Sequence, residues 1–280
     1  MFPLRDHNPS ERTPYVTWAL IAINIAVFLS YFPSIGDEER VLMSFYSDWA
    51  LVPRLVSQGD QTYTIFTSMF LHAGWLHLAG NMLFLYIFGD NLEDAMGHVG
   101  YLIFYLASGV AAAFGQMLAD PASPVPMVGA SGAIAGVMGG YLLLFPHARV
   151  DLVLILFVIV KVITIPAWLL LGLWFALQLA NGTVTAAAGG GVAYWAHAGG
   201  FVAGVMLTLP LWLKRGGPRL WKTSHGQPGH EGWTQERRDA QPPRRGAGPE
   251  ASAPEATGET DIPRAGRRGL RRPSPWGGRR

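Results

Sequence analysis

One serine and one histidine, each in a separate apolar segment, are the residues of this sequence best suited to chemistry. Ser131 lies within Gly129-Ala130-Ser131-Gly132, at the beginning of an apolar stretch, and His197 lies in a later apolar stretch. A hydroxyl or an imidazole surrounded by hydrocarbon is costly unless it is paired or used. A serine beside a histidine that accepts its proton is the smallest set of groups for nucleophilic acyl transfer. The two residues therefore form a candidate catalytic pair if the fold brings them together.

The composition is that of a membrane protein with a charged tail. The chain has 280 residues, of which 50% are hydrophobic and only 14% are charged, whereas soluble domains carry about 25% charged residues. Met1–Leu213 holds 6 Lys/Arg and 12 Asp/Glu, a net charge of −6, and Lys214–Arg280 holds 15 and 7, a net charge of +8. The chain has no cysteine, which excludes disulfides, thiolate nucleophiles and cysteine metal sites.

Six apolar segments approach the roughly 20 residues that a helix needs to cross a bilayer. They are Tyr15–Phe32, Leu76–Asn91, Val99–Leu118, Ser131–Phe145, Pro166–Ala180 and Ala193–Leu213. A further apolar stretch, Asp151–Thr164, is interrupted by Lys161, and we expect it to lie at the membrane interface. The loop segment Leu42–Val56 mixes aromatic and charged residues, which is typical of a part lying among lipid headgroups or of a loop packed on the helices.

The distribution of Lys and Arg predicts the orientation. With six spans both termini lie on one side, and that side receives most of the basic residues outside the spans. Basic residues favour the cytoplasmic side, so we expect a multi-pass protein of the cell membrane with both termini in the cytoplasm. The predicted organisation is a cytoplasmic N-terminal segment (1–14), a membrane domain (15–213) and a disordered basic cytoplasmic tail (214–280). The tail carries no aromatic-interleaved motif, so we expect no nucleic-acid partner.

Four polar residues from three predicted spans fall at a similar depth. His77 and Asn81 lie at the start of the second span, Ser131 at the start of the fourth and His197 about one turn into the sixth. The second, fourth and sixth spans run in the same direction, so all four residues lie in one leaflet. Each has a simpler interpretation, since small residues often serve helix packing and His77 and Asn81 are spaced to bond each other. Convergence at one depth favours a site.

The segment that begins at Ser131 is short. Its 15 residues span about 22 Å at 1.5 Å per residue, less than the hydrocarbon core of about 30 Å. Its N-terminus is therefore expected below the membrane surface, preceded by irregular backbone. A helix N-terminus presents free N–H groups and a positive dipole end, which are parts of an oxyanion hole. Gly129 and Gly132 leave the backbone open to a substrate carbonyl. No Asp or Glu lies at this depth, which favours a Ser–His dyad and disfavours a metal site.

These motifs, in this order, closely resemble those of the rhomboid intramembrane serine proteases. The resemblance rests on Gly129-Ala130-Ser131-Gly132, on His77-x-x-x-Asn81 and on His197-x-Gly-Gly-x-x-x-Gly, and it covers about Thr13 to Leu213. It implies an all-α six-helix membrane bundle of the bacterial type in which Ser131 is the nucleophile and His197 the general base. His77, Asn81 and the Ser131 amide would hold the oxyanion. Neither a cofactor nor a metal is implied, and the partners would be transmembrane substrates in the lipid bilayer.

The sequence departs from the family pattern at two places. A Trp-Arg pair is common before the segment that matches Ile65-Phe66-Thr67, and Tyr63-Thr64 stands there instead. Some members place a tyrosine four residues after the nucleophile, where it packs on the base, and here that residue is Ala135. The packing on the base would then come from elsewhere, with Trp195 and Tyr194 as candidates. The family resemblance also implies that Asn181–Gly191 is a mobile cap over the site and that the fifth span borders a lateral gate.

The expected activity is cleavage of a peptide bond in or beside a transmembrane segment of another protein. One alternative is a catalytically silent relative that binds membrane clients, although such relatives usually lack the serine or the histidine. The other alternative is a transporter or channel, which would place polar residues along the full depth of a helix, whereas here they cluster in one leaflet. The sequence leaves the substrate and the oligomeric state open.

Overall fold

The computed structural model describes residues 2–156, 159–185 and 193–223. These residues belong to the first of two compact units, Met1–Thr234. The long helices are α1 (Tyr15–Ile35), α5 (Trp75–Met96), α6 (His98–Ala119), α7 (Ser131–Leu144), α8 (Ala167–Thr185) and α9 (Tyr194–Lys214). The short ones are α2 (Glu39–Trp49), α3 (Pro53–Ser57), α4 (Thr64–Thr67), the 3-10 helix η1 (Ser68–Phe70) and α10 (Pro218–Thr223). The strands are β1 (Phe2–Asp6), β2 (Arg149–Leu156) and β3 (Ile159–Pro166).

The helical bundle expected from the sequence is confirmed, and each of the six predicted segments falls on one helix. Within the described residues, α1, α6, α8 and α9 are long and apolar enough to cross a membrane. Helix α5 passes the same test together with α4 and η1, from which it is bent by 93°. Helix α7 has only 14 residues, in line with the short segment expected there. The count of six spans stays a prediction.

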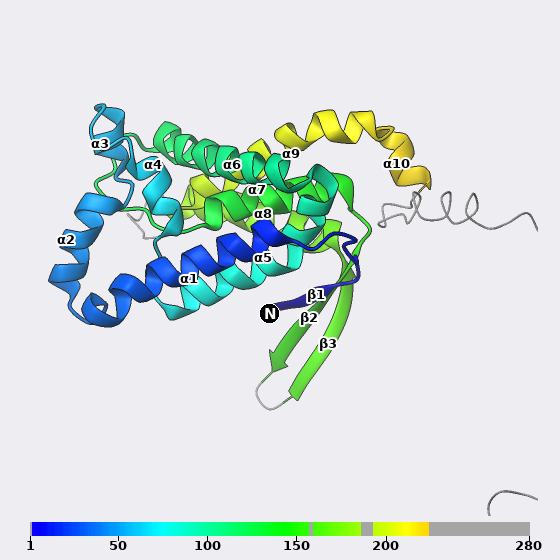
Figure 1. Ribbon diagram of the computed structural model, residues 1–280, viewed down its shortest axis with the longest axis horizontal. Coiled ribbons are helices and arrows are strands. Elements are labelled where there is room, and N and C mark those ends of the chain that lie inside the picture. Colours follow the sequence, from blue (N-terminus) through cyan, green and yellow to red (C-terminus); the bar gives the residue numbers. More distant parts are fainter. Residues whose placement is uncertain (1, 157–158, 186–192, 224–280) are drawn as a thin grey trace, which may run out of the picture. The chain divides into compact units, whose positions relative to one another are not determined.

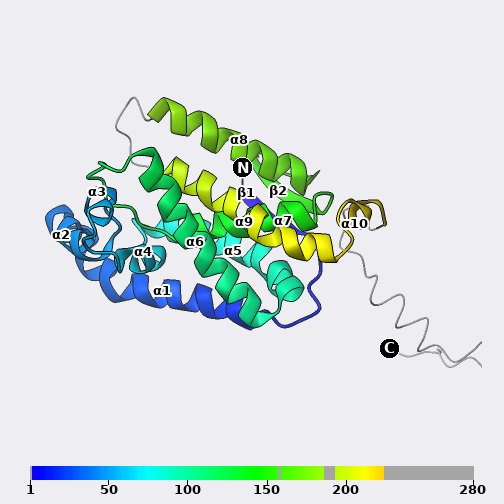
Figure 2. The same cartoon turned by 90° about the horizontal axis from the view of Figure 1, so that it is seen from above.

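The helices run roughly parallel or antiparallel to one another, with α7 in the middle of the bundle (Figure 1). Viewed from above, α1 and α8 lie on opposite sides, with α7 and α9 between them (Figure 2). The core is centred on α7, ten of whose fourteen residues are buried. Large side chains such as Tyr141, Met138 and Phe88 are buried in this core, and the Phe88 ring on α5 lies 4.9 Å from the Tyr141 ring on α7. Only α8 is thinly covered, with 17% of its apolar window buried against 28–39% for the other three long apolar helices.

Glycines let α7 and α9 approach backbone to backbone. A Cβ added at Gly200 would overlap the carbonyl oxygen of Gly132, and one added at Gly204 would overlap that of Gly136. Small residues at such positions allow helices in a membrane to pack closely, because dispersion contacts replace the hydrophobic driving force that is missing there. The two helices that carry Ser131 and His197 are therefore held together with almost no side chain between them.

A three-stranded antiparallel sheet, which the sequence analysis did not anticipate, lies at the end of the bundle away from α2–α4 (Figure 1). Strand β2 pairs with β3 along its whole length and with β1 on its other edge, and the register places Arg5 opposite Asp151. The Asp151 carboxylate accepts hydrogen bonds from Thr164 at 2.6 Å and from the Arg5 guanidinium at 2.9 Å. The segment predicted at the membrane interface is thus a β-hairpin, because its Val and Ile residues favour strands.

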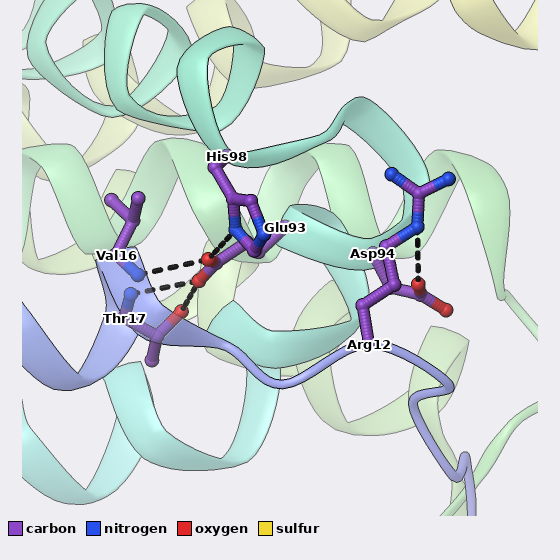
Figure 3. A network of polar contacts seen from close by, with 6 residues as sticks. All are labelled: Arg12, Val16, Thr17, Glu93, Asp94 and His98. Carbon is purple, nitrogen blue, oxygen red and sulfur yellow. Dashed lines mark hydrogen bonds and ion pairs between the residues drawn. The ribbon is translucent and has the colours of Figure 1, made fainter.

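Helix α1 begins against a buried carboxylate from another helix. Pro14, the residue before α1, provides no side-chain cap. The Glu93 side chain, only 1% exposed, accepts hydrogen bonds from the backbone N–H groups of Val16 and Thr17 and from the Thr17 hydroxyl, all at 2.8 Å (Figure 3). His98 contacts the same carboxylate, and Arg12 pairs with Asp94 nearby. A negative charge at a helix N-terminus is stabilising, so this contact fixes α1 to the end of α5.

The C-terminal part of the described chain differs from the expectation of disorder after residue 213. Helix α10 falls within the predicted tail, and the Trp221 indole N–H donates to the Leu143 carbonyl at 2.9 Å. The Trp221 ring also lies 5.1 Å from that of Trp212. From residue 224 on, the predicted tail lies outside the described residues. Part of the expected cap segment, 186–191, lies outside them as well, and α8 continues as helix through Thr185.

Candidate active site

Ser131 is the first residue of α7, at the end of the bundle where α2–α4 lie (Figure 1). The backbone before Ser131 is irregular, because the prolines at positions 121, 124 and 126 disfavour a helix. Backbone hydrogen bonds join part of this segment to neighbouring loops. Met127 and Leu51 exchange backbone hydrogen bonds at 2.8 and 3.1 Å, and the Gly129 N–H donates to the Ser68 carbonyl at 2.9 Å. Residues 126–129 are half-buried and Ala130 is buried, so the part of this irregular backbone next to Ser131 packs against protein, as irregular backbone within a membrane requires.

The structure brings Ser131 and His197 into contact. The Ser131 Oγ lies 2.8 Å from the His197 Nε2, across the α7–α9 interface. Both side chains are half-buried. The distance follows from the close glycine contact between the two helices, since Gly132 and Gly200 lie next in line along the same interface. A hydroxyl within hydrogen-bond reach of an imidazole is the arrangement that activates a serine as nucleophile.

Residues of α8 contact the other side of the His197 ring, and these contacts were not predicted from the sequence. The His197 Nδ1 lies 2.9 Å from the Gln178 Oε1, and the Trp174 ring lies 5.8 Å from the imidazole at an angle of 37°. The expected packing from Trp195 or Tyr194 is not among the ring contacts of His197 in the described part of the chain; Trp174 takes that place. Trp174 and Gln178 are four residues apart on one helix, so they share one face, and this spacing is the signal that was available.

His77 and Asn81 lie on α5 beside the turn that leads to Ser131. The Ala73 N–H donates to the His77 Nδ1 at 3.3 Å, which leaves the proton of the neutral ring on Nε2. A Cβ added at Gly129 would lie 2.9 Å from both Nε2 and Cε1 of His77, so the ring rests on the Gly129 backbone. Gly129 also has φ +129°, a conformation that side chains disfavour. Asn81 is buried, and its Nδ2 has no partner among the described residues.

Three candidate hydrogen-bond donors come from the start of α7 and from the face of α5 that carries His77. They are the Nε2–H of His77, the side-chain amide of Asn81 and the Ser131 backbone N–H, which as a first-turn group has no acceptor within its helix. Donors of this kind stabilise negative charge that develops on a carbonyl oxygen. Ser131, His197 and these donors are therefore candidates for a nucleophile, a base and an oxyanion hole.

The loop between α1 and α5 is tied down without the Trp-Arg pair. The Tyr63 hydroxyl donates to the Asp48 carbonyl at 2.7 Å, and the Thr67 hydroxyl donates to the Trp49 carbonyl at 2.7 Å. The Tyr31 hydroxyl donates to the His72 carbonyl at 2.6 Å from inside the bundle. Helix α2 therefore packs on the bundle through a buried face, and its other face remains exposed.

Comparison with known proteins identifies the family. The Rhomboid domain family model matches residues 59–214, more than half of the chain. Rhomboid protein 1, mitochondrial, of Saccharomyces cerevisiae is 31% identical over 199 residues, covering 68% of this chain and 51% of that protein. Rhomboid protease GluP of Bacillus subtilis is 33% identical over 129 residues, which are 46% of this chain and 24% of GluP. Inactive rhomboid protein 1 of Drosophila melanogaster is 35% identical over 122 residues, 40% of this chain and 8% of that protein.

The chain spans about half, or less, of the length of these relatives. The matched range contains α5 to α9 and all six residues of the candidate site. The match to the family model and the apolar helices together indicate a membrane protein. This protein is a member of the rhomboid family.

Proposed function

We propose that this protein is an intramembrane serine endopeptidase that cleaves transmembrane segments of other membrane proteins. The observation that carries the proposal is the 2.8 Å contact between the Ser131 Oγ and the His197 Nε2. The candidate donors on α5 and at the start of α7, and the protease among the similar proteins, support it further. Ser131, His197, His77 and Asn81 are the residues to which we assign the chemistry, with the backbone at Gly129 and Gly132 shaping the site.

The geometry suggests the following steps. His197 accepts the Ser131 proton at Nε2 as the Ser131 Oγ attacks the scissile carbonyl carbon. The oxygen of the tetrahedral intermediate becomes negative and is stabilised by the His77 Nε2–H, the Asn81 amide and the Ser131 backbone N–H. His197 then gives its proton to the leaving amine, which departs with the C-terminal part of the substrate. Water, deprotonated by His197, hydrolyses the acyl-enzyme and restores Ser131.

The proposed substrates are helices that unwind easily near the cut. Amides inside an intact helix are hydrogen-bonded and shielded, and breaking those bonds within a bilayer costs several kcal/mol for each unsatisfied group, by order of magnitude. Helix-weakening Gly, Pro or polar residues lower this cost. We therefore expect a preference for such residues beside the cleaved bond, and for a small residue at the bond itself.

We also propose a cell-membrane location with six spans, and the Lys/Arg distribution supports placing both termini in the cytoplasm. In this orientation Ser131 lies toward the outer leaflet, and the β1–β2–β3 sheet and α10 lie at the cytoplasmic end. We propose 15–213 as the membrane domain, preceded by a short cytoplasmic segment and followed by the basic tail.

A second candidate function is the binding of membrane clients without cleavage. One similar protein is named as an inactive rhomboid protein, and this is the observation that favours the binding function. The presence of both Ser131 and His197 in hydrogen-bond contact supports the protease instead.

The test is reconstitution of the full chain in lipid vesicles with a single-span reporter substrate. We expect cleavage by the wild type and none by Ser131→Ala or His197→Ala, and labelling of Ser131 by a fluorophosphonate probe in the wild type alone. Cleavage that persists in Ser131→Ala would refute the mechanism. A wild type that binds the reporter but neither cleaves it nor reacts with the probe would support the binding function.

A further inference from the structure

The histidine of the proposed dyad has a third partner that neither the motifs nor the family resemblance assigns. Gln178 projects from α8, is 9% exposed, and places its Oε1 2.9 Å from the Nδ1 of His197. The Ser131 Oγ lies 2.8 Å from the opposite ring nitrogen. The imidazole is thus bridged between a nucleophile on α7 and an amide on α8. This inference rests on the proposed function and adds a residue to it.

The Gln178 carbonyl selects one tautomer of a neutral His197. An amide oxygen accepts hydrogen bonds and cannot donate them, so the ring nitrogen that faces it must carry the proton. With the proton on Nδ1, Nε2 has a free lone pair directed at the Ser131 hydroxyl. With the proton on Nε2, the ring could not accept the serine proton. Gln178 therefore does for His197 what an aspartate does in a Ser-His-Asp triad, where it holds the base in the correct tautomer and orientation.

A neutral amide suits this position better than a carboxylate would. No Asp or Glu lies within hydrogen-bond reach of His197 among the described residues, and the site sits among apolar helices. An isolated buried carboxylate carries a large desolvation cost, whereas an amide in the same place carries a much smaller one. Gln178 can therefore orient the His197 ring although no acidic residue lies beside it among the described residues.

Trp174 restricts the ring in the remaining direction. Its centroid lies 5.8 Å from that of His197 and 6.1 Å from that of Phe201, which is one helical turn further along α9. Trp174 and Gln178 are one turn apart on α8, so one face of this helix supplies both the stacking surface and the hydrogen bond. We infer that Gln178 is a positioning residue that holds His197 in the Nδ1–H tautomer, with Trp174 limiting rotation of the ring.

Two substitutions of Gln178 separate positioning from packing. Gln178→Met keeps the length and approximate volume of the side chain and removes the acceptor. Gln178→Glu keeps an acceptor and introduces a charge. Under our inference Glu lowers the thermal midpoint because its charge is buried, but the folded protein keeps its activity to within a few fold. Met lowers kcat and the rate of fluorophosphonate labelling of Ser131 by about 10–100-fold, with KM nearly unchanged. If Gln178 only fills space, the order reverses, since Met packs well and a buried charge does not.

A matched control is Gln116→Met. Gln116 accepts a hydrogen bond from the Ala196 N–H at 3.3 Å, so this variant also removes a glutamine contact to α9 without touching His197. It is expected to label at the wild-type rate. The variants are compared as full chains in vesicles, with thermal unfolding recorded for each.

A second readout reports the tautomer itself. In protein with 15N-labelled histidine, assigned through His197→Ala, the wild type is expected to show a protonated Nδ1 and an unprotonated Nε2 at His197, and Gln178→Met to lose that preference. Equal labelling of wild type and Gln178→Met, with an unchanged His197 spectrum, would overturn the inference while leaving the protease intact. A wild type that fails to label would count against the proposed function alone, and the spectrum would still decide the role of Gln178.

Discussion

The glycine contact between α7 and α9 predicts that one methyl group at Gly200 separates the nucleophile from its base. The Cβ of an alanine at this position would overlap the Gly132 carbonyl oxygen and would lie 3.0 Å from its carbonyl carbon and 3.2 Å from the Ala112 Cβ. Ordinary contacts between carbon atoms lie at about 3.5–4.0 Å. Because the neighbours are mostly backbone, relief requires the helices to move apart by about 1 Å.

A displacement of this size is enough to break the catalytic contact. The distance between the Ser131 Oγ and the His197 Nε2 would grow from 2.8 Å to about 3.8 Å, which is too long for a hydrogen bond. Misplacement of reacting groups by about 1 Å can cost 100-fold in rate, and overpacking of this kind typically destabilises a fold by about 1–3 kcal/mol. Gly200→Ala is therefore expected to fold, with a moderately lower thermal midpoint, and to lose about two orders of magnitude in activity.

The assay is fluorophosphonate labelling of Ser131 in vesicles, with thermal unfolding of the same samples. Gly172→Ala on α8 is the matched control, because a Cβ there meets nothing within 4 Å, and it should behave as the wild type. Gly204→Ala opens the same interface about one turn further from His197 than Gly200 does, with its Cβ 2.5 Å from the carbonyl carbon and the Cα of Gly136. This variant should lower stability similarly but activity less. A folded Gly200→Ala variant that labels at the wild-type rate would refute the reasoning.

Three further predictions concern stability, each measured by thermal unfolding in detergent micelles. Glu93→Gln is expected to cost about 2–4 kcal/mol, because a buried acceptor for the α1 N-terminus is replaced by an amide that cannot accept all of its contacts; an unchanged midpoint would contradict the capping role. Burial raises the pKa of the Asp6 carboxyl to about 7, above the unfolded value, so its contribution is full below pH 4 and is lost as the pH rises through 7; between pH 5 and 8 the wild type should lose up to about 2 kcal/mol that Asp6→Asn does not. Trp221→Phe should cost about 1 kcal/mol through the lost hydrogen bond to Leu143, and an unchanged midpoint would contradict a contribution from this bond.

The helices and the family were predictable because each leaves a local signal. Apolar runs of the length of a bilayer identify α1, α6, α8 and α9, and the short run after Ser131 already indicated that α7 begins late. Gly200 and Gly204 are spaced to lie on one face of an apolar helix, as in close helix contacts, and the structure shows that contact with α7. Each of these signals can be recognised within one continuous stretch of the sequence.

The rest depended on contacts between distant parts of the chain. Asp151–Thr164 reads as an apolar interfacial segment, and only the pairing of β2 with both β3 and residues near the N-terminus makes it part of a sheet. Gln178 belongs to no recognised motif, and its contact with His197 can be assigned only once it is known which face of α8 meets α9. In the sequence, Glu93 is only a charged residue near the end of a predicted span. That it accepts hydrogen bonds from the N-terminus of α1 is seen only in the folded structure. No local pattern records which face of one helix meets another.

The position of β1 also sets an order for assembly of the protein. Residues 2–6 are synthesised before the other described elements, yet their partners in β2 lie about 150 residues later in the chain. At about 5–20 residues per second of synthesis, the strand waits on the order of 10–30 s before its partner exists. By then α1, α5, α6 and α7 have been synthesised, so β1 can join the sheet only after those helices are available. Its pairing with β2 therefore forms only after α7, which carries Ser131 and the Tyr141 that contacts Asp6, has been synthesised, and it can form before α9 brings His197.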